Sequence, residues 1–451
     1  MRKSLQIALV LVMLCALKGF AQEETGGGWN VFGSMQTGIN IQFTDMLDDG
    51  PFIYAGGQEK SEAAYMLLKI NWANPTEVFG FETGAIFKGT GISANIDGSY
   101  GINWNIKVDN TFGWIKFLDK RITLYGGGGE FEFGEHFKTP GPVDSNLDMA
   151  GFGAVLICQP LLGLFNDMHN LRIGASAWVK EGHQTLINEA KYIGHIAYLF
   201  EDLFTVNFNF AYRQYGPKFY ADEESGDTTY NDQLAKDHRL NFGVNFIGLE
   251  EFGFRKIAVD AEFRDLGGGR TTIFDKIAQF NQNRAGDYMV IKPFHFGQTI
   301  QWIGINDKLS VTASFKQVLY LGDDEVKIYR NANDYTNKVN TYAPSLSYMV
   351  DVSFKVLDYL IPKLGLVYIQ NSNPFDTIAS DLRFNEGLIS DSCEKDTGGI
   401  QIRAAVELVV MSKGFLELGY SINKNLTKDI VATNRQSTMD HGPYLSLKVN
   451  F

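Results

Sequence analysis

Apolar and polar residues alternate with a period of two along most of this chain, and residues 442–451 show the alternation clearly. In an extended strand, successive side chains point to opposite faces. The apolar face would carry Leu445, Leu447, Val449 and Phe451, and the polar face would carry Tyr444, Ser446, Lys448 and Asn450. A strand buried on both faces would not interleave Lys448 with hydrophobic residues. The pattern therefore predicts a strand between an apolar and an aqueous environment.

The same alternation recurs in further segments of strand length, which gives eighteen predicted strands when the terminal one is included. The segment 149–164 is the most continuously apolar and shows the alternation least. The other predicted strands are 31–43, 64–72, 78–88, 100–109, 121–126, 171–180, 191–200, 204–213, 240–246, 257–263, 294–302, 309–315, 346–356, 364–369, 400–408, 416–422 and 442–451.

Connections between these strands alternate in length. Those that close hairpins have roughly 2 to 10 residues, and those between hairpins mostly have roughly 10 to 25. A propeller or a tandem sandwich also contains many alternating strands, but its connections do not follow a short-long rule and its apolar faces pack inward. The alternation predicts an all-β chain with short turns at one end, long loops at the other, and both termini at the turn end.

The first 21 residues carry the features of a secretory signal peptide. Arg2 and Lys3 precede the apolar run 5–17, and a small residue stands on each side of Phe20. We expect cleavage after Ala21 and a single domain over residues 22–451. Beyond residue 22 no stretch approaches the roughly 20 apolar residues of a membrane helix, so a membrane-embedded chain would have to cross as strands.

Charge and cysteine content narrow the function further. Asp and Glu number 52 against 40 Lys and Arg, a net charge of −12, and the signal segment holds three of the cations. An acidic chain is a poor partner for nucleic acid or for anionic lipid surfaces. Of three cysteines only Cys158 and Cys393 lie beyond the signal segment, one in an apolar strand and one in a polar loop. A disulfide framework is not expected.

The terminal strand ending in Phe451, together with the signal peptide and the strand pattern, resembles bacterial outer-membrane β-barrels of the porin-like class. The resemblance implies one transmembrane antiparallel barrel of 16–18 strands in the bacterial outer membrane, with short periplasmic turns and long extracellular loops. It further implies passive diffusion of small hydrophilic solutes, contact with outer-membrane lipid, recognition of the terminal strand by the barrel-assembly machinery, and a homotrimer. Two alternatives stay open: a fatty-acid-transporter-like barrel for hydrophobic substrates, and a non-conducting surface adhesin or structural barrel.

The polar faces of the predicted strands supply the candidate functional residues. Charged side chains cannot be buried dry without partners, so a wall that carries many of them requires water or ion pairing. The predicted pore-lining residues are Lys69, Glu82, Lys88, Lys107, Asp109, Arg172, Lys180, Lys191, Arg213, Asp260, Glu262, Arg264, Lys316, Asp351, Lys355, Arg403, Glu407, Glu417 and Lys448. Their slight basic excess would favour anionic solutes, whereas pairing across the barrel would make many of them structural.

No catalytic pattern is evident, so we predict neither an enzyme nor a metal or cofactor site. The seven histidines lack metal-ligand spacing, and neither HExxH nor G-x-S-x-G occurs. The acidic segments 222–224, 323–325 and 376–396 would be solvated loops or sites for divalent cations. The segment 271–283 has helical spacing and would narrow the pore or cap the surface. Trp72 and Trp302 lie next to predicted short turns, where aromatic belts occur.

Overall fold

A computed structural model describes residues 28–451 of the chain, apart from segments in the connections. The segments not described within this range are 45–51, 56–61, 95–99, 132–148, 165–167, 180–189, 201–202, 215–218, 222–227, 231–235, 264–292, 321–325, 330–337, 343, 372–397 and 427–438. The predicted signal peptide, the three acidic loop segments and the predicted helical segment 271–283 all lie outside the described residues.

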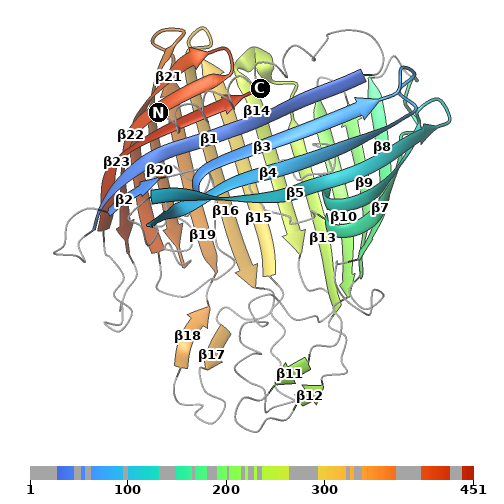
Figure 1. Ribbon diagram of the computed structural model, residues 1–451, viewed down its shortest axis with the longest axis horizontal. Coiled ribbons are helices and arrows are strands. Elements are labelled where there is room, and N and C mark those ends of the chain that lie inside the picture. Colours follow the sequence, from blue (N-terminus) through green and yellow to red (C-terminus); the bar gives the residue numbers. More distant parts are fainter. Residues whose placement is uncertain are drawn as a thin grey trace.

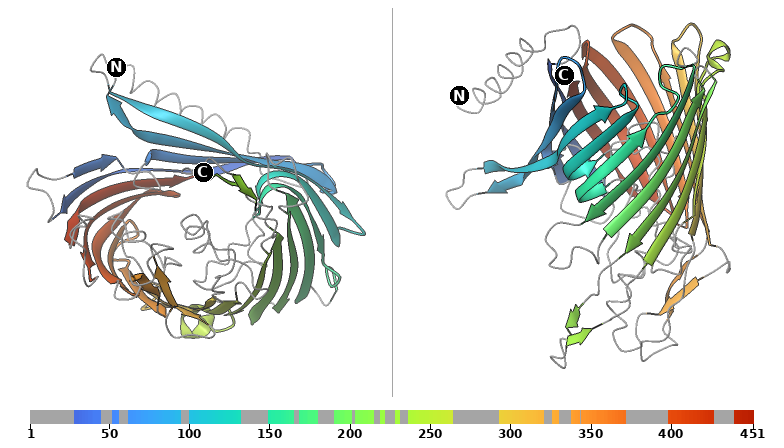
Figure 2. Two further views of the ribbon diagram at one scale, coloured as in Figure 1. Left: turned by 90° about the horizontal axis from the view of Figure 1, so that it is seen from below. Right: turned by 90° about the vertical axis from the view of Figure 1, so that its right-hand side faces the viewer.

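Within the described residues, nineteen strands form one antiparallel sheet, and eighteen of them close it into a ring (Figures 1 and 2). The ring closes at β1 (Gly28–Thr44), which pairs with β3 (Glu62–Ala73) on one side and β23 (Met439–Asn450) on the other. The short β2 (Phe52–Ala55) also pairs with β1. The single antiparallel barrel predicted from the sequence is confirmed, at the upper end of the expected strand number.

The other strands of the ring pair with their neighbours in chain order. They are β4 (Phe79–Ala94), β5 (Tyr100–Phe117), β6 (Ile122–Phe131), β7 (Met149–Cys158), β8 (His169–Val179), β9 (Ala190–Phe200), β10 (Phe204–Gln214), β13 (Lys236–Phe246), β14 (Phe254–Phe263), β15 (Pro293–Gly304), β16 (Leu309–Tyr320), β19 (Ser345–Phe354), β20 (Leu360–Gln370), β21 (Gly398–Met411) and β22 (Gly414–Asn425). Every predicted strand corresponds to one of these or to β1, β3 or β23.

The two ends of the barrel differ as the connection lengths predicted. At the turn end, the shortest connection is 412–413 and the longest is 159–168. At the loop end, the longest connection is 264–292. The connection 95–99 is an exception, because it is short although it joins β4 to β5 at the loop end. Two small hairpins extend from the loop end in Figure 1: β11 (Phe219–Ala221) with β12 (Thr228–Tyr230), and β17 (Val326–Tyr329) with β18 (Lys338–Tyr342).

Along each strand, burial and polarity are reversed relative to a soluble protein. On β21, Ile402 is 44% exposed and Val406 38%, whereas Gln401 is fully buried and Arg403 is only 6% exposed. The apolar residues therefore point out of the ring and the polar residues point into it. An outer surface of this kind is stable only against lipid, and a closed ring leaves no sheet edge unpaired in the hydrocarbon. The chain is a transmembrane barrel of the outer-membrane type, and the predicted location is confirmed.

Aromatic side chains form belts on the outer face near both ends. At the turn end, the Trp72 ring lies 6.4 Å from that of Trp29 and 5.9 Å from that of Phe81. Trp302 donates a hydrogen bond from Nε1 to the Phe252 carbonyl, at 3.1 Å. At the loop end, the rings of Phe43 and His441 stack at 5.5 Å. Such belts mark the headgroup levels of a bilayer, as predicted for Trp72 and Trp302.

Candidate functional site

The inner wall of the barrel carries a charged sector, a neutral polar sector and an apolar sector, with a further group of charged residues on β13 to β16. The charged sector lies on β19 to β22, the neutral polar sector on β9, β10 and β13, and the apolar sector on β5 to β10. The candidate functional site is this wall, because the inner face is the surface that a solute crossing the ring would contact.

Five charged residues on the adjacent strands β19 to β22 form a continuous ion-pair network, here called the charged cluster: Asp351, Lys363, Arg403, Glu407 and Glu417. Arg403 Nη2 lies 2.6 Å from Asp351 Oδ1, and Arg403 Nη1 lies 3.5 Å from Glu417 Oε1. Lys363 Nζ lies 2.5 Å from Glu407 Oε2 and 3.0 Å from Glu417 Oε2. The charged cluster holds three carboxylates and two cations, so its own charge is acidic rather than basic.

The strand register explains why these side chains meet. Gly365 is the cross-strand partner of both Asp351 and Arg403, so these two long side chains can reach each other across a residue without a side chain. Glu407 and Glu417 are direct cross-strand partners. Like charges in that position repel, and the Lys363 ammonium between them offsets the repulsion. The pattern therefore requires all four strands in register.

Tyr444 on β23 extends the charged cluster by one strand. Its hydroxyl donates a hydrogen bond to Glu417 Oε1 at 2.6 Å. The ring lies over Gly419, where a Cβ atom would come within 2.4 Å of Tyr444 Cζ. Only glycine leaves room for the ring at this position, so Gly419 sets the direction in which the Tyr444 hydroxyl points.

A ladder of neutral polar groups occupies the wall beside the apolar sector. His195 Nδ1 and Asn209 Oδ1 are 2.8 Å apart, and Asn209 Nδ2 donates to Asn241 Oδ1 at 3.2 Å. Each of these three side chains is at most 1% exposed. Buried polar groups that satisfy one another hold neighbouring strands in a single register.

Two fully buried carboxylates, Asp260 and Glu262, face inward from β14. Glu262 Oε1 lies 3.7 Å from Arg239 Nη1 on β13, and His295 on β15 is the cross-strand partner of Glu262. Lys316 on β16 is 4% exposed and lies two strands from Asp260. Charged residues of both signs thus line this part of the wall at the same level.

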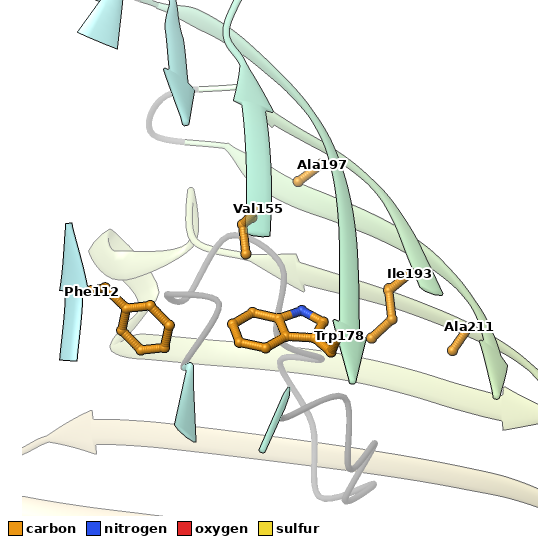
Figure 3. Close-up of a cluster of buried hydrophobic side chains, with 6 residues drawn as sticks. All are labelled: Phe112, Val155, Trp178, Ile193, Ala197 and Ala211. Carbon is orange, nitrogen blue, oxygen red and sulfur yellow. The ribbon is translucent and has the colours of Figure 1, made fainter. Parts of the chain in front are cut away.

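The apolar sector was not predicted from the sequence. Phe112 and Trp178 pack edge to face with ring centroids 5.8 Å apart, and Val155, Ile193, Ala197 and Ala211 complete the cluster (Figure 3). The rings lie against β6 and β7, where Cβ atoms at Gly127 and Gly153 would clash with Phe112 and Trp178 respectively. The glycine run 126–129 was the signal in the sequence, because large rings often cover glycines on a neighbouring strand.

This sector also explains why 149–164 did not alternate. On β7 the outward residues Phe152 and Leu156 face lipid, and the inward Val155 packs in the apolar sector, so both faces are apolar. Trp178 on β8 lies on the inner face at 3% exposure.

The structure places the predicted pore-lining residues in several environments. Lys355 lies in the turn after β19, where it forms an ion pair with Asp358 at 2.9 Å. Lys107 and Lys448 are exposed and lie on the inner face by register: Lys107 is the cross-strand partner of Ile86, which shares the face of Lys88, and Lys448 shares the face of Tyr444. Lys180 and Arg264 lie outside the described residues, as do the side chains of Asp109 and Arg213. The other residues on the inner wall are Lys69, Glu82, Lys88, Arg172, Lys191, Asp260, Glu262, Lys316, Asp351, Arg403, Glu407 and Glu417.

No group of three or more His, Cys, Asp or Glu residues in the described ranges is arranged to hold a metal ion. None of the helices in the same ranges has the length and hydropathy needed to cross a membrane.

Comparisons with known proteins give only distant similarities. No protein-family model matches the sequence, and no curated protein matches it. OprD from Pseudomonas aeruginosa, an outer membrane protein, is 10% identical over 96% of this chain and 95% of its own, with a TM-score of 0.48. Acinetobacter baumannii OccAB1 is 11% identical over 94% and 97%, with a TM-score of 0.49. OmpT, an outer membrane protein of Vibrio cholerae, is 10% identical over 95% and 99%, with a TM-score of 0.38.

Proposed function

We propose that this chain forms a water-filled channel through which small hydrophilic solutes diffuse passively across the outer membrane. The observation that carries the proposal is the charged cluster on the inner wall of a closed ring. Side chains of Asp351, Lys363, Glu407 and Glu417 keep between 17% and 21% of their surface exposed while facing the interior. Charges that are partly exposed inside a barrel need water beside them.

The experiment that tests this function is planar-bilayer recording with the purified, refolded protein. We expect stepwise, ohmic openings, because an aqueous path conducts ions in proportion to the applied voltage. A bilayer that stays silent, with protein shown to be folded and inserted, would contradict the channel and favour the adhesin or the carrier of hydrophobic substrates. In the apolar sector the buried rings of Phe112 and Trp178 leave no exposed surface for such a substrate.

The charged cluster should govern the ion selectivity of the channel. Replacing Lys363 with glutamine removes a cation and should shift the reversal potential in a salt gradient toward cation selectivity. Replacing Glu407 with glutamine removes a carboxylate and should shift the reversal potential in the opposite direction, since the lining charge sets the local concentration of counter-ions. The two variants are matched controls for each other. Equal shifts of the same sign, or no shift in either variant, would show that the permeation path avoids the charged cluster.

We further propose that the barrel-assembly machinery recognises the terminal strand. Phe451 extends the seam between β1 and β23 by two backbone hydrogen bonds with Gly33, each 2.9 Å long. Deleting Phe451 should reduce the amount of folded barrel in the outer membrane, because it removes the terminal signal and the two hydrogen bonds with Gly33. The measurement is heat-modifiable electrophoretic mobility of outer-membrane fractions. Deletion without any loss of folded barrel would contradict this role, and efficient refolding of the deleted chain in detergent would separate recognition from stability.

The last two parts of the proposal concern the oligomeric state and the removal of the signal peptide. We propose a homotrimer, which native mass spectrometry in detergent would test. We also propose cleavage after Ala21, which the mass of the mature protein would test. The homotrimer is what the resemblance to the porin-like class implies, and the cleavage is what the small residues on each side of Phe20 indicate.

A further inference from the structure

Exposed apolar side chains stand at the short turns, at the end of the barrel that carries the aromatic belt around Trp72 and Trp302. Leu118 is 70% exposed, Ile305 60% and Met411 55%. Leu118 and Ile305 lie in the connections β5–β6 and β15–β16, and Met411 ends β21. These side chains stand at the level of the aromatic belt, where exposed apolar surface can contact lipid.

Two of these turns hold the apolar residue in a costly backbone conformation. Leu118 and Ile305 have φ values of 49° and 54°, in the left-handed region that favours glycine or asparagine. Both turns have the same form: the Leu118 carbonyl accepts a hydrogen bond from the Arg121 N–H, and the Ile305 carbonyl accepts one from the Lys308 N–H. An apolar side chain is therefore presented at the same place in two separate turns, although the backbone there disfavours it.

A cation follows each of the three apolar residues within three positions: Arg121 after Leu118, Lys308 after Ile305, and Lys413 after Met411. None of the three makes an ion pair among the described residues, and Lys308 and Lys413 are exposed. We call these three apolar–cation pairs the turn rim.

The acidic groups near the turn rim are mostly neutralised by other cations. Lys120 Nζ lies 2.8 Å from Glu77 Oε2, and this hydrogen bond lowers the pKa of the Glu77 carboxyl. Arg255 lies 3.8 Å from Asp307 and 3.0 Å from Glu250, and Lys355 lies 2.9 Å from Asp358. Within the three turns, Asp119 is the one acid for which no ion pair forms among the described residues. The three cations of the turn rim are therefore left without an ion-pair partner of their own in the described part of the chain.

We propose that the turn rim binds anionic phospholipid at the turn-end surface of the membrane. The apolar side chains would continue the lipid contact of the adjoining aromatic belt, and each cation would lie against a headgroup phosphate. An apolar residue beside a cationic residue is the combination that anchors proteins at the membrane–water interface. The turns would then lie within the headgroup layer instead of projecting into water.

A fluorescent bimane label at Asn306→Cys tests the proposal, because Asn306 is exposed between Ile305 and Lys308. The background is the full mature chain with Cys158→Ser and Cys393→Ser, reconstituted in phosphatidylcholine vesicles. Brominated phosphatidylglycerol or brominated phosphatidylcholine is added as the quencher at equal mole fraction. We expect quenching by the brominated phosphatidylglycerol to exceed that by brominated phosphatidylcholine by about threefold.

Two variants separate the parts of the interaction. Lys308→Gln should abolish the preference between the two lipids, and Ile305→Asn should reduce quenching by both, since asparagine suits the backbone but not the acyl boundary. A label quenched by neither lipid, or a preference that survives Lys308→Gln, would overturn the proposal. Heat-modifiable mobility confirms that each variant is folded. Conductance recorded on the same samples tests the channel independently, so either idea can fail without the other.

Discussion

Replacing Arg403 with methionine is expected to lower the free energy of unfolding of the barrel by about 3 kcal/mol. The Arg403 side chain is 7% exposed and lies between Asp351 and Glu417, at 2.6 Å and 3.5 Å. Methionine has a similar length but no charge, so the variant leaves Asp351 without its cation and leaves Glu417 with Lys363 alone. Urea unfolding in lipid vesicles, followed by tryptophan fluorescence, measures the change.

Arg172→Met is the matched control for this variant. Arg172 also lies on the inner wall and is half-buried, but it makes no ion pair among the described residues. The same substitution there removes a charge without leaving a partner, so we expect little change or a small gain in stability. If both variants lose the same free energy, the Arg403 effect comes from packing of the long side chain and not from the charged cluster. Adding Asp351→Asn to Arg403→Met should recover part of the loss.

Replacing Gly153 with alanine is the second large effect that we expect, with a loss of about 2 kcal/mol. A Cβ atom at Gly153 would lie 2.4 Å from the Ala177 carbonyl oxygen and 2.4 Å from Trp178 Cδ2. The indole would have to leave the wall and turn toward the interior of the ring. We therefore also expect a smaller single-channel current, measured in the same bilayer recordings as for the parent.

Gly194→Ala tests whether the effect is specific to the covered glycine. Gly194 lies on β9 and has no atom within 4 Å of its Cβ position, so alanine fits there without displacement. Alanine also costs less conformational entropy than glycine in a strand, so this variant should be as stable as the parent or slightly more stable. Equal losses in both glycine variants would show that the indole does not rest on Gly153.

The period of two was sufficient to predict the strands and the face that each strand presents. It was sufficient because lipid outside and polar groups inside impose opposite preferences on alternate residues, so the sequence carries the pattern directly. It was least informative at 149–164, where a packed inner cluster makes both faces of β7 apolar. There the alternation disappears because the environments on the two faces are alike.

The candidate site could be predicted only as a set of residues and not as an arrangement. The inward direction of Arg403 and Glu407 follows from their own strand. That Arg403 bridges Asp351 and Glu417, and that Lys363 sits between two carboxylates, depends on the register in which four consecutive strands pair, which the pattern of a single strand does not define. Lys355 shows the opposite limit of the sequence pattern. Its position fits the alternation of the polar face, but it lies just beyond the end of β19 and forms its ion pair within the following turn.

The sequence by itself determined that this protein is an all-β barrel, where its strands run, and which side chains face lipid, since each of these depends on local periodicity. Only the tertiary structure decided how side chains group into charged, neutral polar and apolar sectors on the inner wall, because that grouping depends on the register in which neighbouring strands pair. The net charge illustrates the difference: the acidic total predicts no affinity for anionic lipid, whereas the folded turns leave Arg121, Lys308 and Lys413 without an ion pair among the described residues.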